Sequence, residues 1–202
     1  MHPQLQEIAD DFGAAQARLH RLAETFPAEL WAVRPEPGRW SVGDCVEHLN
    51  RTAEAFLPRV RAAIERGRAL SAPAPARYRR DSLGWLLWRI MPPPVRLRVK
   101  TTAAFLPAAT APAAELVARF DQLQREQLEC VAASDGLPLQ KLWILSPVDG
   151  RARYNLFACL GILPRHQHRH LWQAERVVDE LRRRRTAAAL VAPRLAGERL
   201  AT

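Results

Sequence analysis

Cysteine, lysine and long apolar runs are scarce in this 202-residue chain, and each scarcity excludes a class of protein. The three cysteines, Cys45, Cys130 and Cys159, are widely separated and form no CxxC pair, which argues against a disulfide framework and a structural zinc site. No stretch reaches the ~18 consecutive apolar residues of a membrane span, and the acidic start of the chain is unlike a secretory signal peptide. We therefore expect a soluble protein of the reducing cytoplasm.

Positive charge, in contrast, is abundant and almost entirely arginine. The formal net charge is +9, and the only lysines are Lys100 and Lys141. Such a balance can attract phosphates, anionic membranes or acidic substrates. Nucleic-acid-binding proteins concentrate basic residues on one face among aromatics, whereas these arginines are scattered along the chain. We attribute the arginine-rich composition to the codon bias of a GC-rich genome and expect no nucleic-acid partner.

Apolar periodicity predicts four amphipathic helices. Apolar residues recur at steps of three and four, the spacing of one helix face, and no segment has a convincing strand pattern. Ser41 is an expected N-cap, with Asp44 three residues later as in a capping box. Pro58 and Pro164 are expected to bend their helices. The predicted helices cover Pro3–Phe26, residues 42–64, Ala113–Ser134 and Arg153–Arg185, which gives an all-α, four-helix bundle.

A long crossover, residues 69–111, joins the second and third of these helices, and it contains one short predicted helix, Ser82–Ile90. Its tryptophans are flanked by arginines, a pattern found in membrane-surface segments. Long connections in compact domains more often form lids, so we expect this segment to pack over the end of the bundle. Residues 186–202 are predicted to be a frayed tail, which leaves residues 1–185 as the bundle domain.

The chemistry of the chain is concentrated in the last predicted helix. His166 and His170 occupy positions of its core stripe where the spacing calls for apolar side chains. Four residues make about one helical turn, so both imidazoles lie on the same face. That geometry suits two ligands of one metal ion. The alternative is a pair of histidines exposed on the surface. Two imidazoles in a core, however, need hydrogen-bond partners or ligands, and a shared metal ion satisfies both.

His48 is the predicted third ligand, because it lies at the border of the apolar stripe of the second helix. Alternatively, His48 binds no metal and forms an ordinary hydrogen bond at the edge of the core. Asp44, one turn earlier, is expected either to orient the His48 imidazole or to serve the helix cap. Glu47 could act as a base only if its helix turned it inward, and a solvated position suits it better; Gln173 suits a position facing the site and an ordinary polar position equally. The remaining histidines, expected to lie outside the site, are His2, His20 and the solvated His168.

The pattern excludes the zinc proteases that carry HExxH. Gln167 follows His166, and no glutamate lies between the paired histidines to act as a general base. Three histidines would leave a coordination position open. Such a position can lower the pKa of a bound water, or hold a substrate thiolate or carbonyl.

Three segments of the chain resemble the DinB/YfiT-like superfamily, which includes metal-dependent enzymes. They are RPEPGRWSVGDCVEHL (Arg34–Leu49), HQHRHLWQAE (His166–Glu175) and, less distinctively, KTTAAFLP (Lys100–Pro107). The resemblance covers roughly residues 5–183. It implies a four-helix bundle with a three-histidine metal site, carried here by the three histidines above. Some members of the superfamily are transferases or isomerases that depend on low-molecular-weight bacterial thiols.

Two functions remain open from the sequence. The first is a metal-dependent enzyme in which zinc or nickel, on His48, His166 and His170, activates a thiol or water for transfer or hydrolysis on a small molecule. The second is a non-catalytic helical module, such as a homodimer, that is only stabilised by its metal. Binding to membranes or nucleic acid through the arginines is disfavoured.

Overall fold

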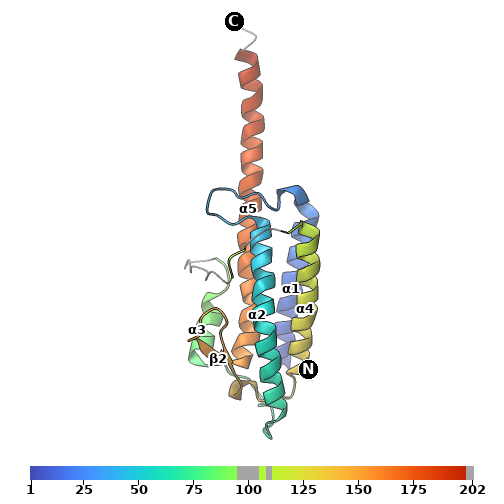
Figure 1. Ribbon diagram of the computed structural model, residues 1–202, viewed down its shortest axis with the longest axis vertical. Helices are drawn as coiled ribbons and strands as arrows, with labels where there is room; N and C mark the ends of the chain where they lie inside the picture. Colours follow the sequence, from blue (N-terminus) through green and yellow to red (C-terminus); the bar gives the residue numbers. More distant parts are fainter. Residues whose placement is uncertain (95–104, 108–110, 199–202) are drawn as a thin grey trace.

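The computed structural model describes residues 1–94, 105–107 and 111–198, with side chains up to residue 187 (Figure 1). Its helices and strands confirm most of the predicted elements and add a small hairpin. In chain order they are α1 (Pro3–Thr25), the 3₁₀ helix η1 (Ala28–Leu30), α2 (Val42–Arg68), α3 (Ser82–Ile90), α4 (Ala113–Ala133), the 3₁₀ helix η3 (Leu139–Lys141), β1 (Trp143–Leu145), β2 (Arg153–Asn155) and α5 (Leu156–Glu198).

Helices α1, α2, α4 and α5 pack side by side, which confirms the all-α, four-helix bundle (Figure 1). Helix α2 packs against α4 and α5, and α1 packs against the same two helices. The chain runs up along α1, down along α2, down again along α4 and up along α5 (Figure 1). Since α2 and α4 are parallel neighbours, a long crossover has to carry the chain back between them.

The N-terminus of α2 is fixed by the predicted capping box. The Ser41 hydroxyl accepts the backbone N–H of Asp44 at 3.0 Å, and the Asp44 carboxylate accepts the backbone N–H of Ser41 at 2.9 Å. Arg34 also donates to this carboxylate, at 2.8 Å. These bonds satisfy amide groups that every helix leaves unpaired at its start. They fix the start of α2 one turn before His48.

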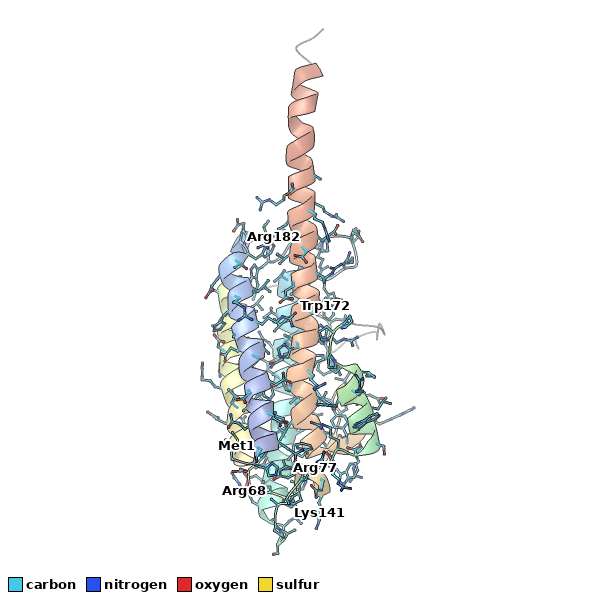
Figure 2. All side chains as sticks on the ribbon, turned by 180° about the vertical axis from the view of Figure 1, so that it is seen from behind. Met1, Arg68, Arg77, Lys141, Trp172 and Arg182 are labelled. Atoms are coloured by element: carbon cyan, nitrogen blue, oxygen red, sulfur yellow. The ribbon has the colours of Figure 1, made fainter. Side chains whose placement is uncertain are left out.

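Three details of the predicted secondary structure were wrong. The described chain contains an antiparallel hairpin, β1 with β2, in which Ile144 lies opposite Tyr154. Its three-residue strands are too short to show an alternating pattern. Because β2 takes up the first predicted helical residues, α5 begins at Leu156 instead of Arg153. Helix α5 also continues past Arg185 to Glu198 and projects beyond the bundle (Figure 1 and, from behind, Figure 2), consistent with the high helix propensity of Ala187–Ala189.

The crossover helix α3 has the predicted bounds, but it lies against the side of α5 and the hairpin, not over the end of the bundle (Figure 1). The Asp81 carboxylate accepts the backbone N–H of Gly84, which caps α3, and that of Asn155, which anchors the cap to β2. Residues 95–104 and 108–110 of the crossover, including most of the KTTAAFLP segment, lie outside the described residues. None of the described helices is long and apolar enough to cross a membrane.

Candidate metal centre

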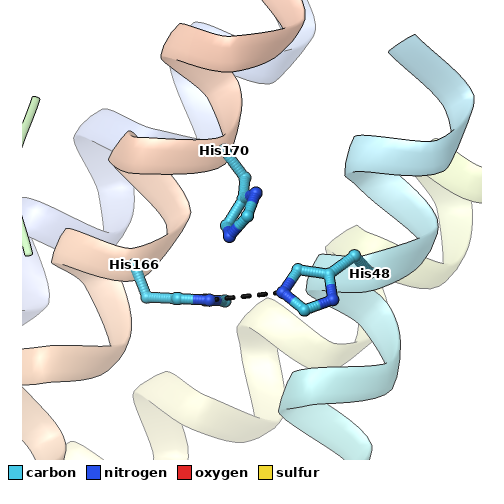
Figure 3. A group of neighbouring side chains, drawn as sticks. All are labelled: His48, His166 and His170. Carbon is cyan, nitrogen blue, oxygen red and sulfur yellow. Dashed lines mark hydrogen bonds between the residues drawn. The ribbon is translucent and has the colours of Figure 1, made fainter. Parts of the chain in front are cut away.

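The structure brings the three predicted histidines together between α2 and α5 (Figure 3). His48 projects from α2, and His166 and His170 project from α5 toward it. One ring nitrogen of each residue lies within 4.8 Å of the corresponding atoms of the other two. The predicted inward orientation of the paired histidines is therefore confirmed. These residues form a group that could hold a metal ion.

The local sequence explains why the α5 histidines face inward. Leu163 lies three residues before His166, and Ala174 lies four residues after His170, and both are buried in the bundle. Leucine and alanine on this stripe are removed from water on folding, which fixes the rotation of α5 about its axis. The two imidazoles follow from that rotation, with ring centroids 4.5 Å apart.

His48 is held in the tautomer that a metal ligand requires. Its Nδ1 lies 2.9 Å from the carbonyl oxygen of Phe105, and because a carbonyl only accepts, Nδ1 carries the proton. The lone pair is then on Nε2, which lies 3.3 Å from Nε2 of His166. Two nitrogens bound to a tetrahedral zinc ion, at about 2.0–2.1 Å from it, would lie about 3.3–3.4 Å apart. The pair therefore has the spacing of two zinc ligands.

The imidazole of His170 is buried and has one ring nitrogen without a hydrogen-bond partner. His170 is 8% exposed, and its Nδ1 has no hydrogen-bond partner. The nearby Gln173 side chain favours the protonated ring, but it does not bond to Nδ1 with good geometry. Buried polar atoms without a partner are rare and costly in folded proteins. A ligand shared by the three rings would help to offset that cost.

All three imidazoles are held in the neutral state. Burial lowers the pKa of His48, and the hydrogen bond to the Phe105 carbonyl only partly opposes it. Burial also lowers the pKa of His166 and His170 well below the usual value, and the neighbouring imidazoles and Arg169 add to the effect. Neutral imidazole is the form that binds transition metals. Near pH 7 the site therefore offers three lone pairs without prior loss of a proton.

Two aromatic residues around the site could not be identified from the sequence as site residues. The Trp40 ring stacks on His170 with centroids 5.6 Å apart, and it lies 5.0 Å from the His48 ring. Phe105 meets His48 edge-on and is itself buried. Together these rings shield His48 and His170 from water, while His166 stays partly exposed. His166 is therefore the most exposed of the three ligand residues.

The structure assigns other roles to the remaining candidates. Asp44 serves the helix cap, while the Phe105 carbonyl orients His48. Glu47 pairs with Arg51 at 2.7 Å. His168 is only partly exposed, and its Nε2 lies 3.2 Å from the Asp11 carboxylate, so the prediction of a solvated residue was wrong. The two other histidines also lie elsewhere, His2 at the cap of α1 and His20 against Asp121.

A buried amide network sets the rotation of α5 from behind the site. Gln167 lies between the paired histidines and is 4% exposed. Its side-chain amide donates to Gln124 at 2.8 Å and accepts from it at 3.2 Å, and Gln124 also donates to the Phe12 carbonyl. Reciprocal amide bonds of this kind fix both side chains in register. From the sequence alone, Gln167 was notable only because it occupies the position of the glutamate in HExxH.

We expect Gln167→Leu to destabilise the protein by about 1–3 kcal/mol, because Gln124 would keep a buried amide without its partner. The double variant Gln124→Leu, Gln167→Leu should be less destabilised than the sum of the two single changes. Urea unfolding of all four proteins measures the coupling. Additive losses would show that the two amides do not act as a pair.

The Asp44 carboxylate makes the stability of the protein depend on pH. Burial alone would raise its pKa, but hydrogen bonds from Arg34 and Ser41 outweigh burial and lower it. A carboxylate with a lowered folded pKa stabilises the fold above its unfolded pKa of about 3.9, and this contribution is lost as the pH falls through the folded pKa.

We therefore expect Asp44→Asn to cost about 0.5–2 kcal/mol at pH 7, the range for a lost cap. Between pH 5 and pH 3 the variant should lose less stability than the wild type, because it has no carboxylate to protonate at this position. Urea unfolding at the two pH values tests this. Parallel pH profiles for the two proteins would exclude Asp44 as the source.

The fold and the site together define an α-helical bundle with a buried three-histidine centre between two of its helices. A family model described as the DinB superfamily matches residues 11–174, and the chain belongs to that superfamily. The match includes all three histidines. No curated protein and no solved structure gives a significant match to the chain.

Proposed function

We propose that the protein is a metal-dependent enzyme of the cytoplasm, with His48, His166 and His170 as the ligands of a zinc or nickel ion. The observation that carries this proposal is the convergence of three neutral imidazoles, with the Nε2 atoms of His48 and His166 separated by 3.3 Å. Imidazole suits both metals. The bundle, residues 1–185, would be the catalytic domain, with residues 186–202 as a tail. The three free, buried cysteines suit a reducing compartment.

The ligand set supports catalysis more than a purely structural role. Among the described residues, the group contains three histidines and no further cysteine, aspartate or glutamate. Structural zinc sites have four protein ligands, whereas catalytic sites keep one position for water or substrate. When bound, such an ion acts as a Lewis acid that lowers the pKa of a thiol or water beside it.

The side chains around the centre define what the chain itself contributes. The Phe105 carbonyl keeps the lone pair of His48 turned toward the site, and Trp40 excludes water from the His170 side. The Glu47 carboxylate is paired with Arg51, and no hydrogen bond joins it to the three imidazoles. Among the described residues, no carboxylate joins the three imidazoles to act as a general base. This favours a nucleophile that ionises readily near neutral pH, namely a low-molecular-weight thiol or an activated water, attacking a small molecule in a transferase or hydrolase reaction.

One observation favours a second candidate function, a metal-stabilised bundle without catalysis. His48 is 5% exposed and His170 is 8% exposed, so two of the three ligands are closed to solvent. In that case the ion would stabilise the packing of α2 against α5, either in a monomer or in a homodimer. Metals that bind only the folded state add their binding energy to its stability.

Elemental analysis and an activity screen distinguish these functions. We expect about one zinc or nickel ion per chain in the purified protein. Low-molecular-weight thiols are then tested against small electrophiles, and ester and amide substrates are tested without a thiol, each with metal-free and reloaded protein. Turnover that requires the ion supports the enzyme. Stoichiometric metal that raises the melting temperature without any turnover supports the structural role, and absence of metal contradicts both.

A further inference from the structure

A cluster of two arginines lies on the flank of α5 beside the metal centre, where α3 packs against it. The guanidinium of Arg165 lies 3.6 Å from the centre of the Trp88 ring, and that of Arg80 lies 4.1 Å from the same ring. Arg80 also lies 4.6 Å from the ring of Phe157. The stacking fixes both cations in place.

Neither guanidinium is neutralised by a carboxylate in the described chain. Arg80 is partly buried and makes no described hydrogen bond or ion pair, and its Nε is a buried atom without a partner. Arg165 donates only to the Trp88 carbonyl, at 3.2 Å. The charge of Asp11 raises the pKa of Arg165, but the Asp11 carboxylate is paired with His168. Partly buried cations are normally paired, so this cluster departs from the rule.

The position of the Arg80 guanidinium depends on a glycine of α5. A Cβ atom at Gly161 would lie 3.0 Å from Nη2 and 3.5 Å from Nε of Arg80. The guanidinium therefore rests close to the backbone of α5, between Phe157 and Trp88. The two rings and the α5 backbone fix the orientation of the guanidinium, and its Nη groups, which unlike Nε are not buried without a partner, are the donors left for a carboxylate or phosphate.

The two positive charges also oppose each other. Burial lowers the pKa of Arg80 to about 10, and the charge of Arg165 adds to the effect, opposed by Glu7 from a distance. Burial likewise lowers the pKa of Arg165, and Arg89 contributes in the same direction. A bound anion would relieve this repulsion and accept hydrogen bonds from the accessible guanidinium nitrogens.

We propose that Arg80 and Arg165 form a binding site for the anionic group, a carboxylate or a phosphate, of a small molecule. Arg165 directly precedes His166, and Gly161 lies five residues before it, which corresponds to about 7–8 Å along a helix. Consecutive residues of a helix project about 100° apart, so a small molecule that extends around α5 could place its anionic group at the arginines and its reactive group at the histidines. This assignment of the anion to a substrate rests on the proposed function, whereas anion binding itself does not require the metal.

Titration calorimetry with inorganic phosphate and with succinate, at constant ionic strength in sodium chloride, tests the site. We expect saturable binding of at least one of the two anions, and the tighter one identifies the group that is recognised. Arg80→Gln and Arg165→Gln should each weaken binding about tenfold, the loss expected for one charge-assisted contact. Arg176→Gln removes the same charge from an exposed position of α5 and should leave the affinity unchanged.

Gly161→Ala provides a second, charge-neutral variant. Alanine is a better helix former than glycine, but its methyl group would lie 3.0 Å from Nη2 of Arg80 and 3.3 Å from Trp88. It should displace the Arg80 guanidinium and weaken binding, and a melting curve checks that the variant stays folded. Binding that is absent, or equal in all variants including Arg176→Gln, overturns the proposal.

The titrations are performed on metal-free and metal-loaded protein. If the protein binds anions but takes up no metal, the anion site is supported and the proposed function is rejected. If it takes up metal and shows turnover but binds no anion, the proposed function is supported and the anion site is rejected.

Discussion

Replacement of His48, His166 or His170 by alanine is expected to lower the affinity for zinc at least about a hundredfold. Loss of a residue that only orients a ligand already costs about 10–100-fold in affinity, and a lost ligand should cost more. The group of ring nitrogens within 4.8 Å of one another contains no further ligand residue among the described ones. No other side chain can therefore replace a missing imidazole without rearrangement. Competition with a chromophoric chelator measures the affinity, and elemental analysis measures the stoichiometry.

His168→Ala is the matched control for these variants. It removes an imidazole from the same helix, but from a residue that faces Asp11 and Arg18 instead of α2. Its zinc affinity should equal that of the wild type. Because burial lowers the pKa of all three site imidazoles, protons should compete with zinc only below the ordinary imidazole pKa of about 6.5. Equal zinc affinity in the His48→Ala, His170→Ala and wild-type proteins would reject the proposed site.

Gly84→Ala is expected to detach α3 from α5 and to destabilise the protein by about 1–3 kcal/mol or somewhat more, the range for an overpacked contact. A Cβ atom at Gly84 would lie 2.3 Å from the Cβ of Ala158 and 2.7 Å from Oδ1 of Asp81. Neither neighbour can move easily, because Ala158 is buried in α5 and Asp81 caps α3 while anchoring it to Asn155. Urea unfolding measures the loss, and hydrogen exchange over residues 78–94 locates it.

Gly13→Ala is the control for this substitution. It makes the same chemical change inside α1, at a position where an added Cβ would meet no atom within 4 Å. We expect it to stabilise the protein by about 0.5–1 kcal/mol, because alanine has the higher helix propensity. If Gly84→Ala behaved like Gly13→Ala, α3 would not be packed against α5 as the structure shows.

The sequence alone determined the fold class and the candidate ligands, because both depend on local periodicity. The bounds of α1 and α4 follow from an apolar residue at every third or fourth position, and the start of α2 follows from Ser41 and Asp44. Two histidines on an otherwise apolar stripe have to face the core. Their partner His48 could be chosen for the same reason, since it borders the stripe of a second helix.

The tertiary structure alone decided how the site is completed, because its other parts come from segments distant in the chain. The Phe105 carbonyl that orients His48 lies 57 residues away from it, and Trp40 belongs to an irregular segment without periodicity. Likewise, only the packing of α3 on α5 places Arg80 and Arg165 on one tryptophan. Helical spacing thus predicts which residues share a face, whereas the neighbours that hold a charge or orient a ring depend on how the helices and their crossover pack.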